Sequence, residues 1–174
     1  MALREILKYP HPILRKKAEP VTEFGQALKE LIYDMAETMY AAPGVGLAAN
    51  QIGILQQIVV IDVSPRDDKT KLIPLINPVI LAGEGSDVSE EGCLSVVDYA
   101  ADVKRFTHIS IEARDPEGRK IAFEADGWFA RDIQHEVDHL DGKLFIDRIS
   151  SLKRSLYKKK RRKQLKEEQA DFDD

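Results

Sequence analysis

The segment that most constrains this chain is His135-Glu136-Val137-Asp138-His139, which has the form H-E-x-x-H. Residues four apart on an α-helix are separated by about 40° around the axis and about 6 Å along it, so both imidazoles can reach one metal ion. Glu136 then projects beside that ion as a candidate base. The segment therefore predicts a metal-binding helix; its alternative is a solvated, charged helix face with two histidines by chance.

The residues around this segment repeat with the period of an amphipathic helix. The helix is predicted to extend from Asp126, a residue type that caps helix N-termini, to Gly142, a residue type that ends helices. Its apolar positions are Phe129, Ile133, Val137 and Leu140. This helix carries the candidate metal ligands.

Two further helices are predicted towards the ends of the chain. One covers about residues 23–41, before the breaker Pro43-Gly44. Its apolar positions are Leu28, Leu31, Ile32, Met35 and Met39. The other starts near Ser150 or Ser151, has a basic outer surface and frays at Asp171–Asp174. Its apolar positions are Leu152, Leu156 and Leu165.

Between the helices the pattern changes to that of β-strands. Gln57–Val63 is rich in β-branched residues, and Leu72–Leu81 is a second apolar run. Phe106–Ala125 is predicted to be a hairpin, because two alternating segments flank the turn residues Asp115–Gly118. Strands in the middle with helices at both ends predict an α+β domain.

Composition limits the class of protein further. A chain of 174 residues is long enough for one domain with a sizeable core. It contains one cysteine, so no internal disulfide is possible. The sequence shows no apolar run long enough to cross a bilayer and no apolar secretion signal near Met1–Glu5. We therefore expect a cytoplasmic protein that does not bind membranes.

Two histidines need a third ligand, with one position left open for water or substrate. The extended pattern H-E-x-x-H-x-x-G-x-x-H fails because Phe145 stands where its last histidine belongs. A downstream glutamate would have to be Glu167 or Glu168, both in the charged tail. Cys93, in the segment Glu91–Ser95, is the better candidate, although a single cysteine is most often an inert buried residue.

A loop of small residues, Gly44–Gln51, follows the first predicted helix. Small side chains leave backbone N–H and C=O groups free to pair with an extended peptide, and Gln51 adds an amide donor. The loop is not a phosphate-binding loop, because no Lys-Ser/Thr follows its glycines. On its own it indicates only a turn or a peptide-binding edge.

In chain order, the three segments GVGLAANQ, EGCLS and QHEVDHLDG resemble the signature motifs of the peptide deformylases. The similarity extends to Tyr9–Pro12, Ile76–Pro78 and Gly142–Phe145, and so covers residues 4 to about 150. It implies an α+β fold in which antiparallel or mixed sheets surround the H-E-x-x-H helix. It also implies removal of the formyl group from N-formylmethionyl nascent peptides.

The resemblance assigns a role to each matching residue. The metal ligands are Cys93, His135 and His139, with water in the fourth position, and the acid/base is Glu136. The oxyanion donors are the Gln51 side-chain amide and the Leu94 backbone N–H. The substrate-binding residues include Val45 and Gly46, whose backbone holds the peptide as an added strand. Helical spacing adds Arg131 and Trp128, four and seven residues before His135 on the same face, as residues that border the methionine pocket.

The resemblance also bears on the metal and on a salt bridge. It points to Fe(II), with Ni, Co or Zn as substitutes, whereas a Cys/His₂ set with water fits zinc on general grounds. An Arg105–Glu91 ion pair is expected to fix the Cys93 loop; its alternative is an ordinary surface pair. For Trp128 the alternative is plain core packing.

Charge divides the chain into two parts. Residues 1–152 carry 17 Lys/Arg against 25 Asp/Glu, whereas 153–174 carry 9 against 5, with an unbroken basic run at Lys158–Lys163. We therefore expect a catalytic domain at 1–150 and a basic C-terminal helix with an acidic frayed end at 151–174. The resemblance suggests that this helix docks on the ribosome, with no specific DNA binding; its alternative is a solubilising helix.

Two other functions stay open on the sequence alone. H-E-x-x-H by itself is also typical of zinc metalloproteases, which need a third His or Glu ligand. A basic-tailed nucleic-acid-binding module with a structural zinc needs a fourth protein ligand instead. The position and identity of the third ligand therefore decide between these classes.

Overall fold

The apolar strands of the middle of the chain form two antiparallel sheets in the computed structural model, which describes residues 2–64 and 71–174. The larger sheet has the strand order β1-β2-β3-β6-β7, and β4 pairs with β5 in the smaller one. The strands are β1 Gly46–Ala48, β2 Ile58–Ile61, β3 Ile73–Glu84, β4 Asp87–Cys93, β5 Val96–Arg105, β6 His108–Arg114 and β7 Lys120–Asp126.

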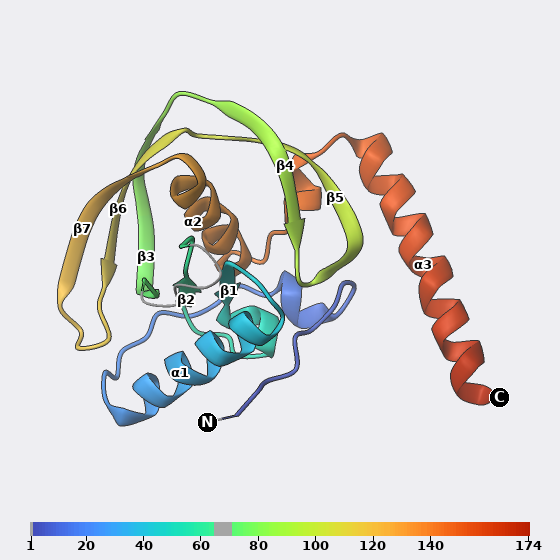
Figure 1. The fold of residues 1–174 in the computed structure, drawn as a ribbon, viewed down its shortest axis with the longest axis horizontal. Coiled ribbons are helices and arrows are strands. Elements are labelled where there is room, and N and C mark those ends of the chain that lie inside the picture. The colour runs from blue at the N-terminus through green and yellow to red at the C-terminus, as the bar shows by residue number, and fades with distance from the viewer. Residues whose placement is uncertain (1, 65–70) are drawn as a thin grey trace.

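Helices lie within and around these sheets. They are α1 Gln26–Ala41, α2 Gly127–Leu140 and α3 Ser151–Asp173, with short 3₁₀ helices at Pro12–Arg15, Ala49–Ile52 and Phe145–Arg148. Strands β3, β6 and β7 arch over α2 on one side and β4 and β5 on the other, whereas α3 lies along the edge of the molecule (Figure 1). The fold is α+β, as the sequence predicted, and its sheets surround the helix that carries H-E-x-x-H.

Alternation of apolar and polar residues explains why α2 is enclosed. In β6 the side chains of Ile109, Ile111 and Ala113 are buried, and the residues between them are not. These side chains pack against Ala130 and Ile133 of α2, which belong to the same core cluster. The apolar face of α2 is therefore fixed against the larger sheet.

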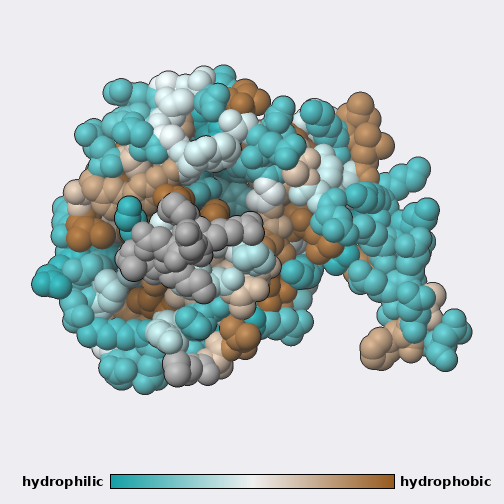
Figure 2. Space-filling view, viewed as in Figure 1, coloured by the Kyte–Doolittle hydropathy of each residue, from teal (hydrophilic) through white to brown (hydrophobic). Residues whose placement is uncertain are grey.

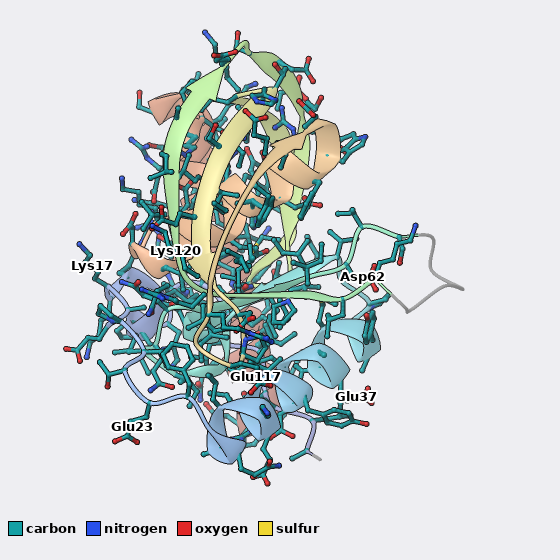
Figure 3. The ribbon with its side chains drawn as sticks, turned by 90° about the vertical axis from the view of Figure 1, so that its left-hand side faces the viewer. Lys17, Glu23, Glu37, Asp62, Glu117 and Lys120 are labelled. Atoms are coloured by element: carbon teal, nitrogen blue, oxygen red, sulfur yellow. The ribbon has the colours of Figure 1, made fainter. Side chains whose placement is uncertain are left out.

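A second core lies between α1 and the same sheet. Leu28, Ile32, Met35 and Met39 of α1 are buried, as their helical spacing predicted. In the side view, α1 with Glu37 and the N-terminal segment with Lys17 and Glu23 lie below the strands that arch over α2 (Figure 3). The helix begins at Gln26 and not at residue 23. Gly25 before it is extended, and Phe24 packs against the core instead of continuing the helix.

The strand predictions hold with shifted ends. The run Gln57–Val63 becomes β2 and Leu72–Leu81 becomes β3, and the hairpin at Phe106–Ala125 is confirmed as β6 and β7. Its turn depends on Asp115, whose Oδ1 accepts the backbone N–H groups of Glu117 and Arg119 at 2.8 and 2.9 Å. Strands β4 and β5 were not predicted. Strand β4 is mostly polar and exposed, and in β5 charged residues interrupt the apolar ones.

Contrary to the sequence prediction, Asp126 does not cap α2 with its side chain. Asp126 occupies the N-cap position, but its carboxylate accepts no hydrogen bond from the helix. Its Oδ1 lies 2.5 Å from Nδ1 of His108, and the other ring nitrogen, Nε2, lies 3.1 Å from Glu124 Oε1. The start of α2 is thus tied to β6 and β7 by a side-chain pair.

Helix α3 docks through residues other than the predicted leucines. Leu152 and Leu156 are exposed, whereas Tyr157 and Arg161 are buried. The Tyr157 ring lies 4.8 Å from that of Tyr99 on β5, and Arg161 Nε donates to the carbonyl of Tyr9 at 2.9 Å. The helix also continues to Asp173 instead of fraying at 171.

Membrane insertion can be judged only from the described helices. Within residues 2–64 and 71–174, none of the helices is long and apolar enough to cross a bilayer.

Candidate metal centre and active site

Three potential ligand atoms converge between α2 and the end of β4. The ligand atoms of Cys93, His135 and His139 all lie within 4.8 Å of one another. Cys93 Sγ is 3.4 Å from His139 Nε2, which is 3.3 Å from His135 Nε2. Helical spacing puts the histidines on one face, and the β4–β5 hairpin, which the sequence did not predict, brings the cysteine to them.

The chemistry of these atoms fits a divalent metal ion. His135 Nδ1 lies 2.9 Å from Glu91 Oε1, so the ring donates from Nδ1 and its Nε2 lone pair faces the other two ligands. Burial lowers the pKa of His139 well below its usual value, which keeps that imidazole neutral, the form that binds metals. A thiol with two imidazoles and an open position is a donor set for a soft or borderline ion.

The buried carboxylate of Glu91 connects His135 to two arginine side chains. Arg105 binds it through two hydrogen bonds of 2.9 Å, and Arg131 Nη1 contacts Glu91 Oε2 at 2.7 Å. Burial alone would raise the pKa of Glu91, but the hydrogen bonds from Arg105 and His135 outweigh it and hold that pKa well below its usual range. The predicted Arg105–Glu91 pair is confirmed, and its surface alternative is wrong, because the two side chains are 2% and 6% exposed.

The same network continues along α2. Asp138 Oδ2 accepts from Arg105 Nη1 and from Arg148 Nε, both at 2.6 Å. Two carboxylates and three guanidinium groups, counting Arg131, therefore form one connected set of charges. Because Glu91 and Asp138 lie near His135 and His139, this network restricts the orientation of the helix face that carries both histidines.

Glu136 has a very different environment. Burial raises its pKa to about 7, and its Oε2 atom is buried with no hydrogen-bond partner among the described residues. Gly46 of β1 approaches closely: a Cβ atom there would lie 2.7 Å from Glu136 Oε1. Glycine at 46 is thus required for the carboxylate to lie where it does, and the carboxylate can exchange a proton near neutral pH.

Gln51 points its amide nitrogen into the site. Its Oε1 accepts the Ala48 backbone N–H at 2.9 Å, which leaves Nε2 to contact Ser95 Oγ at 3.0 Å and Cys93 Sγ at 3.7 Å. Leu94 follows Cys93 in the hairpin turn and lines the same space. Both predicted donor residues therefore lie beside the three ligands.

A cavity of about 470 Å³ opens in front of these residues. The predicted substrate-binding residues Val45, Gly46, Trp128 and Arg131 all line it. Trp128 is 63% exposed, so the core-packing alternative is wrong for this side chain. The guanidinium of Arg131 turns away to Glu91 and to the carbonyls of Val103 and Asp87, so it is the rest of the side chain that faces the cavity.

Two acidic residues of the cavity wall were not predicted. Asp132 lies on α2 and Glu90 on β4, and both line the cavity. Asp132 precedes His135 by three residues and Glu136 by four, so helical spacing from the motif was the signal that placed it here. Glu90 had no such signal, because β4 itself was not predicted.

The structure decides between the open alternatives for the third ligand. Phe145 stacks on His135 with ring centroids 6.2 Å apart, and Glu168 contacts Arg161 on α3. Among the described residues the metal-binding group has three members, without the fourth protein ligand that a structural zinc needs. A three-ligand set beside a buried carboxylate in an open cavity defines a mononuclear metal-dependent hydrolase.

Comparison with known proteins names the family. Residues 3–155 match the family model described as polypeptide deformylase. The chain is 50% identical over 160 residues to the peptide deformylase of Thermodesulfovibrio yellowstonii, covering 92% of this chain and 97% of that one. It is 47% identical over 167 residues to that of Syntrophobacter fumaroxidans, covering 96% and 98%.

Solved structures agree with this result. A peptide deformylase from Legionella pneumophila is 43% identical, with a TM-score of 0.89 over 97% of this chain and 98% of that one. One from Synechococcus elongatus, in complex with actinonin, is 37% identical, with a TM-score of 0.86 over 91% and 87%. The chain belongs to the peptide deformylase family of metal-dependent hydrolases.

The ligand assignment predicts a defect in metal binding for Cys93→Ser. A neutral hydroxyl replaces a thiolate, so the affinity for the metal should fall. Losing a residue that only hydrogen-bonds a ligand typically lowers affinity by about 10- to 100-fold, and the loss of a ligand should cost at least as much. Metal content after dialysis and titration with Zn²⁺ or Ni²⁺ measure it, with circular dichroism as the check on folding. Unchanged affinity in the folded variant would remove Cys93 from the ligand set.

Proposed function

We propose that this chain removes the formyl group from N-formylmethionyl nascent peptides and releases formate. The observation that supports this most directly is the buried Glu136 carboxylate, with its raised pKa, beside Cys93, His135 and His139 in an open cavity. Membership of the deformylase family supports the substrate class.

Glu136 performs the proton transfers in this proposal. A metal ion bound by the three ligands supplies Lewis acidity towards the formyl oxygen and acidifies water. Glu136 takes a proton from water as the water oxygen attacks the formyl carbon, and it then delivers that proton to the departing amine when the C–N bond breaks. Its pKa of about 7 suits both steps near neutral pH.

Fixed donors stabilise the negative charge that develops on the formyl oxygen. We assign this role to the Gln51 side-chain amide and the Leu94 backbone N–H. The hydrogen bond from Ala48 N to Gln51 Oε1 supports the first assignment, because it orients Nε2 towards Cys93 before substrate binds. A preorganised donor of this kind contributes roughly 3 to 4 kcal/mol to catalysis.

The peptide is held beside β1. This strand is at the edge of the larger sheet, paired with β2 on one side, so its other side can accept an extended peptide as an added strand. We assign this contact to the backbone at Val45 and Gly46. Trp128 and the aliphatic part of Arg131 then border the pocket for the methionine side chain.

For the metal we propose Fe(II), with Ni, Co or Zn as substitutes. The family is metal-dependent, and the Cys-His-His set leaves a divalent ion with a net charge of about +1, enough to act as a Lewis acid. The site for this ion lies in residues 1–150, which we propose as the catalytic domain, acting in the cytoplasm.

We also propose that the basic C-terminal helix binds the ribosome. Helix α3 exposes Lys159, Arg162, Lys163 and Lys166 along one groove, and its visible surface is mostly hydrophilic (Figure 2). The acidic body would be repelled by a phosphate-dense surface, so the helix supplies the attraction and orients the cavity. Truncation after Ser151 is a poor test of this role, since it removes the buried Tyr157 and Arg161.

Substitution of the proposed base tests the function. Glu136→Gln should keep the metal but lose most activity, by about 100-fold or more, because the ligands are intact and the proton acceptor is gone. Formate release from formyl-Met-Ala-Ser by metal-replete wild type and variant measures it. Near-normal turnover in the variant would refute the role of Glu136, and no formate from the wild type would refute the function itself.

Charge removal on α3 tests ribosome binding without unfolding the helix. Four exposed cations of the groove, Lys159, Arg162, Lys163 and Lys166, are replaced by Gln. The fifth, Lys160, is kept because its Nζ donates to the carbonyl of Asp98 at 3.0 Å. A control variant removes the same charge from the body at Lys16, Lys17, Lys104 and Lys143. Co-sedimentation with ribosomes should show binding about tenfold weaker for the α3 variant than for the control. As the salt concentration rises, binding should fall more steeply for the wild type than for the α3 variant, because the wild type makes more contacts with phosphate. Equal binding by both variants would leave α3 without a role in docking.

A further inference from the structure

The N-terminal segment lies against both parts of the chain that carry the proposed oxyanion donors. In Figure 1 this segment passes below the turn between β4 and β5. The backbone N–H of Leu7 donates to the carbonyl of Gln51 at 2.7 Å, and that of Tyr9 donates to the carbonyl of Ser95 at 2.8 Å. The segment therefore joins Gln51 to the turn that follows Cys93.

Lys8, between these two residues, contacts the same turn through its side chain. Its Nζ atom donates to the carbonyl of Leu94 at 2.8 Å, although the residue is exposed. Within residues 2–64 and 71–174 the ammonium group forms no ion pair, so its charge is directed at this carbonyl. Hydrogen bonds from a charged donor are roughly twice as strong as those between neutral groups.

The Leu94 carbonyl belongs to the same peptide group as the N–H of Ser95. That N–H donates to Cys93 Sγ, 3.5 Å away. Lys8 and the sulfur atom therefore hold opposite ends of one peptide group, in a two-residue turn between the paired residues Cys93 and Val96. A cation at the carbonyl end also polarises this group and strengthens the N–H donor at its other end.

Fixing this peptide group restricts the donor on the other side of Leu94. Strand pairing holds Cys93 before the Leu94 N–H, and the Lys8 contact holds the peptide group after it. Each residue has only two soft backbone dihedral angles, so the N–H between these fixed points has little freedom to turn. Gln51, the other proposed donor, contacts Oγ of Ser95 in the same turn at 3.0 Å. The Lys8 contact therefore orders both donors before substrate binds.

We propose that Lys8 is a positioning residue for deformylation, whose ammonium group holds the Leu94–Ser95 turn so that the Leu94 N–H faces the formyl oxygen. This inference rests on the proposed function, in which that N–H stabilises the oxyanion. Lys8 is not among the described residues that line the cavity, so it acts through Leu94 and not on the substrate. Its loss displaces a donor without deleting it, and the effect is smaller than the roughly 100- to 1,000-fold loss that follows deletion of such a donor.

The kinetic test compares a neutral and a cationic replacement. Lys8→Met removes the charge and should lower kcat about three- to tenfold with KM unchanged within about twofold, because the oxyanion forms only in the transition state. Lys8→Arg keeps a cationic donor and should recover most of kcat. Lys17→Met removes the same charge from an exposed side chain further along the chain (Figure 3) and should retain the wild-type kcat. Formate release from formyl-Met-Ala-Ser at equal metal content measures all four proteins.

Amide hydrogen exchange gives a measurement that does not depend on activity. In the Zn²⁺-loaded protein, the Ser95 amide should exchange at least about threefold faster in Lys8→Met than in the wild type, Lys8→Arg or Lys17→Met, with the amides of β6 unchanged. An unchanged kcat in Lys8→Met, a loss that Lys8→Arg does not recover, or unchanged Ser95 exchange would overturn the inference and leave the proposed function intact. If the wild type released no formate, the proposed function would fail, and Ser95 exchange would still decide whether Lys8 holds the turn.

Discussion

The buried Glu91 carboxylate is the interaction on which the rest of the site depends. It accepts hydrogen bonds from His135, Arg105 and Arg131, and so joins helix α2 to strands β4 and β5. A buried charge is stable only when it is paired and fully hydrogen-bonded, which these partners provide. Because Glu91 and Cys93 are two residues apart in β4, the contact that orients His135 also fixes the approach of the cysteine.

Two neighbouring carboxylates acquire opposite properties from this arrangement. Guanidinium and imidazole partners hold the pKa of Glu91 well below its usual range, so it remains charged and serves to orient the ring. Glu136, buried without such partners, has a pKa raised to about 7 and can exchange protons. The different roles of the two carboxylates therefore follow from their surroundings: Glu91 on β4 contacts charged donors, whereas Glu136 on α2 lies against Gly46 of β1.

Local patterns predicted the parts of this structure that local physics determines. The four-residue spacing of His135 and His139 and the apolar period around them placed α2 and its metal-binding face. The turn at Asp115 placed the β6–β7 hairpin. Each follows from residues that are close together in the chain.

Long-range contacts explain what the sequence could not predict. Helix α3 docks through Tyr157 and Arg161, whose partners Tyr9 and Tyr99 are far away in the chain. In the β4–β5 hairpin, β4 is mostly polar and one of the alternating buried residues of β5 is the charged Arg105. The sequence pattern therefore predicted neither the position of Glu90 nor the contact of Cys93 with the histidines. Asp126 pairs with His108 instead of capping α2, because a strand neighbour competes with the helix for its carboxylate.

The protonation of the His135 ring tests the central claim most directly. If Glu91 orients this ring, nitrogen NMR of the Zn²⁺-loaded protein will show a slowly exchanging proton on Nδ1 and none on Nε2, which is bound to the metal. A proton on Nε2, or an Nδ1 without one, would contradict the account, because the ring would then not be held by Glu91 in its metal-binding form.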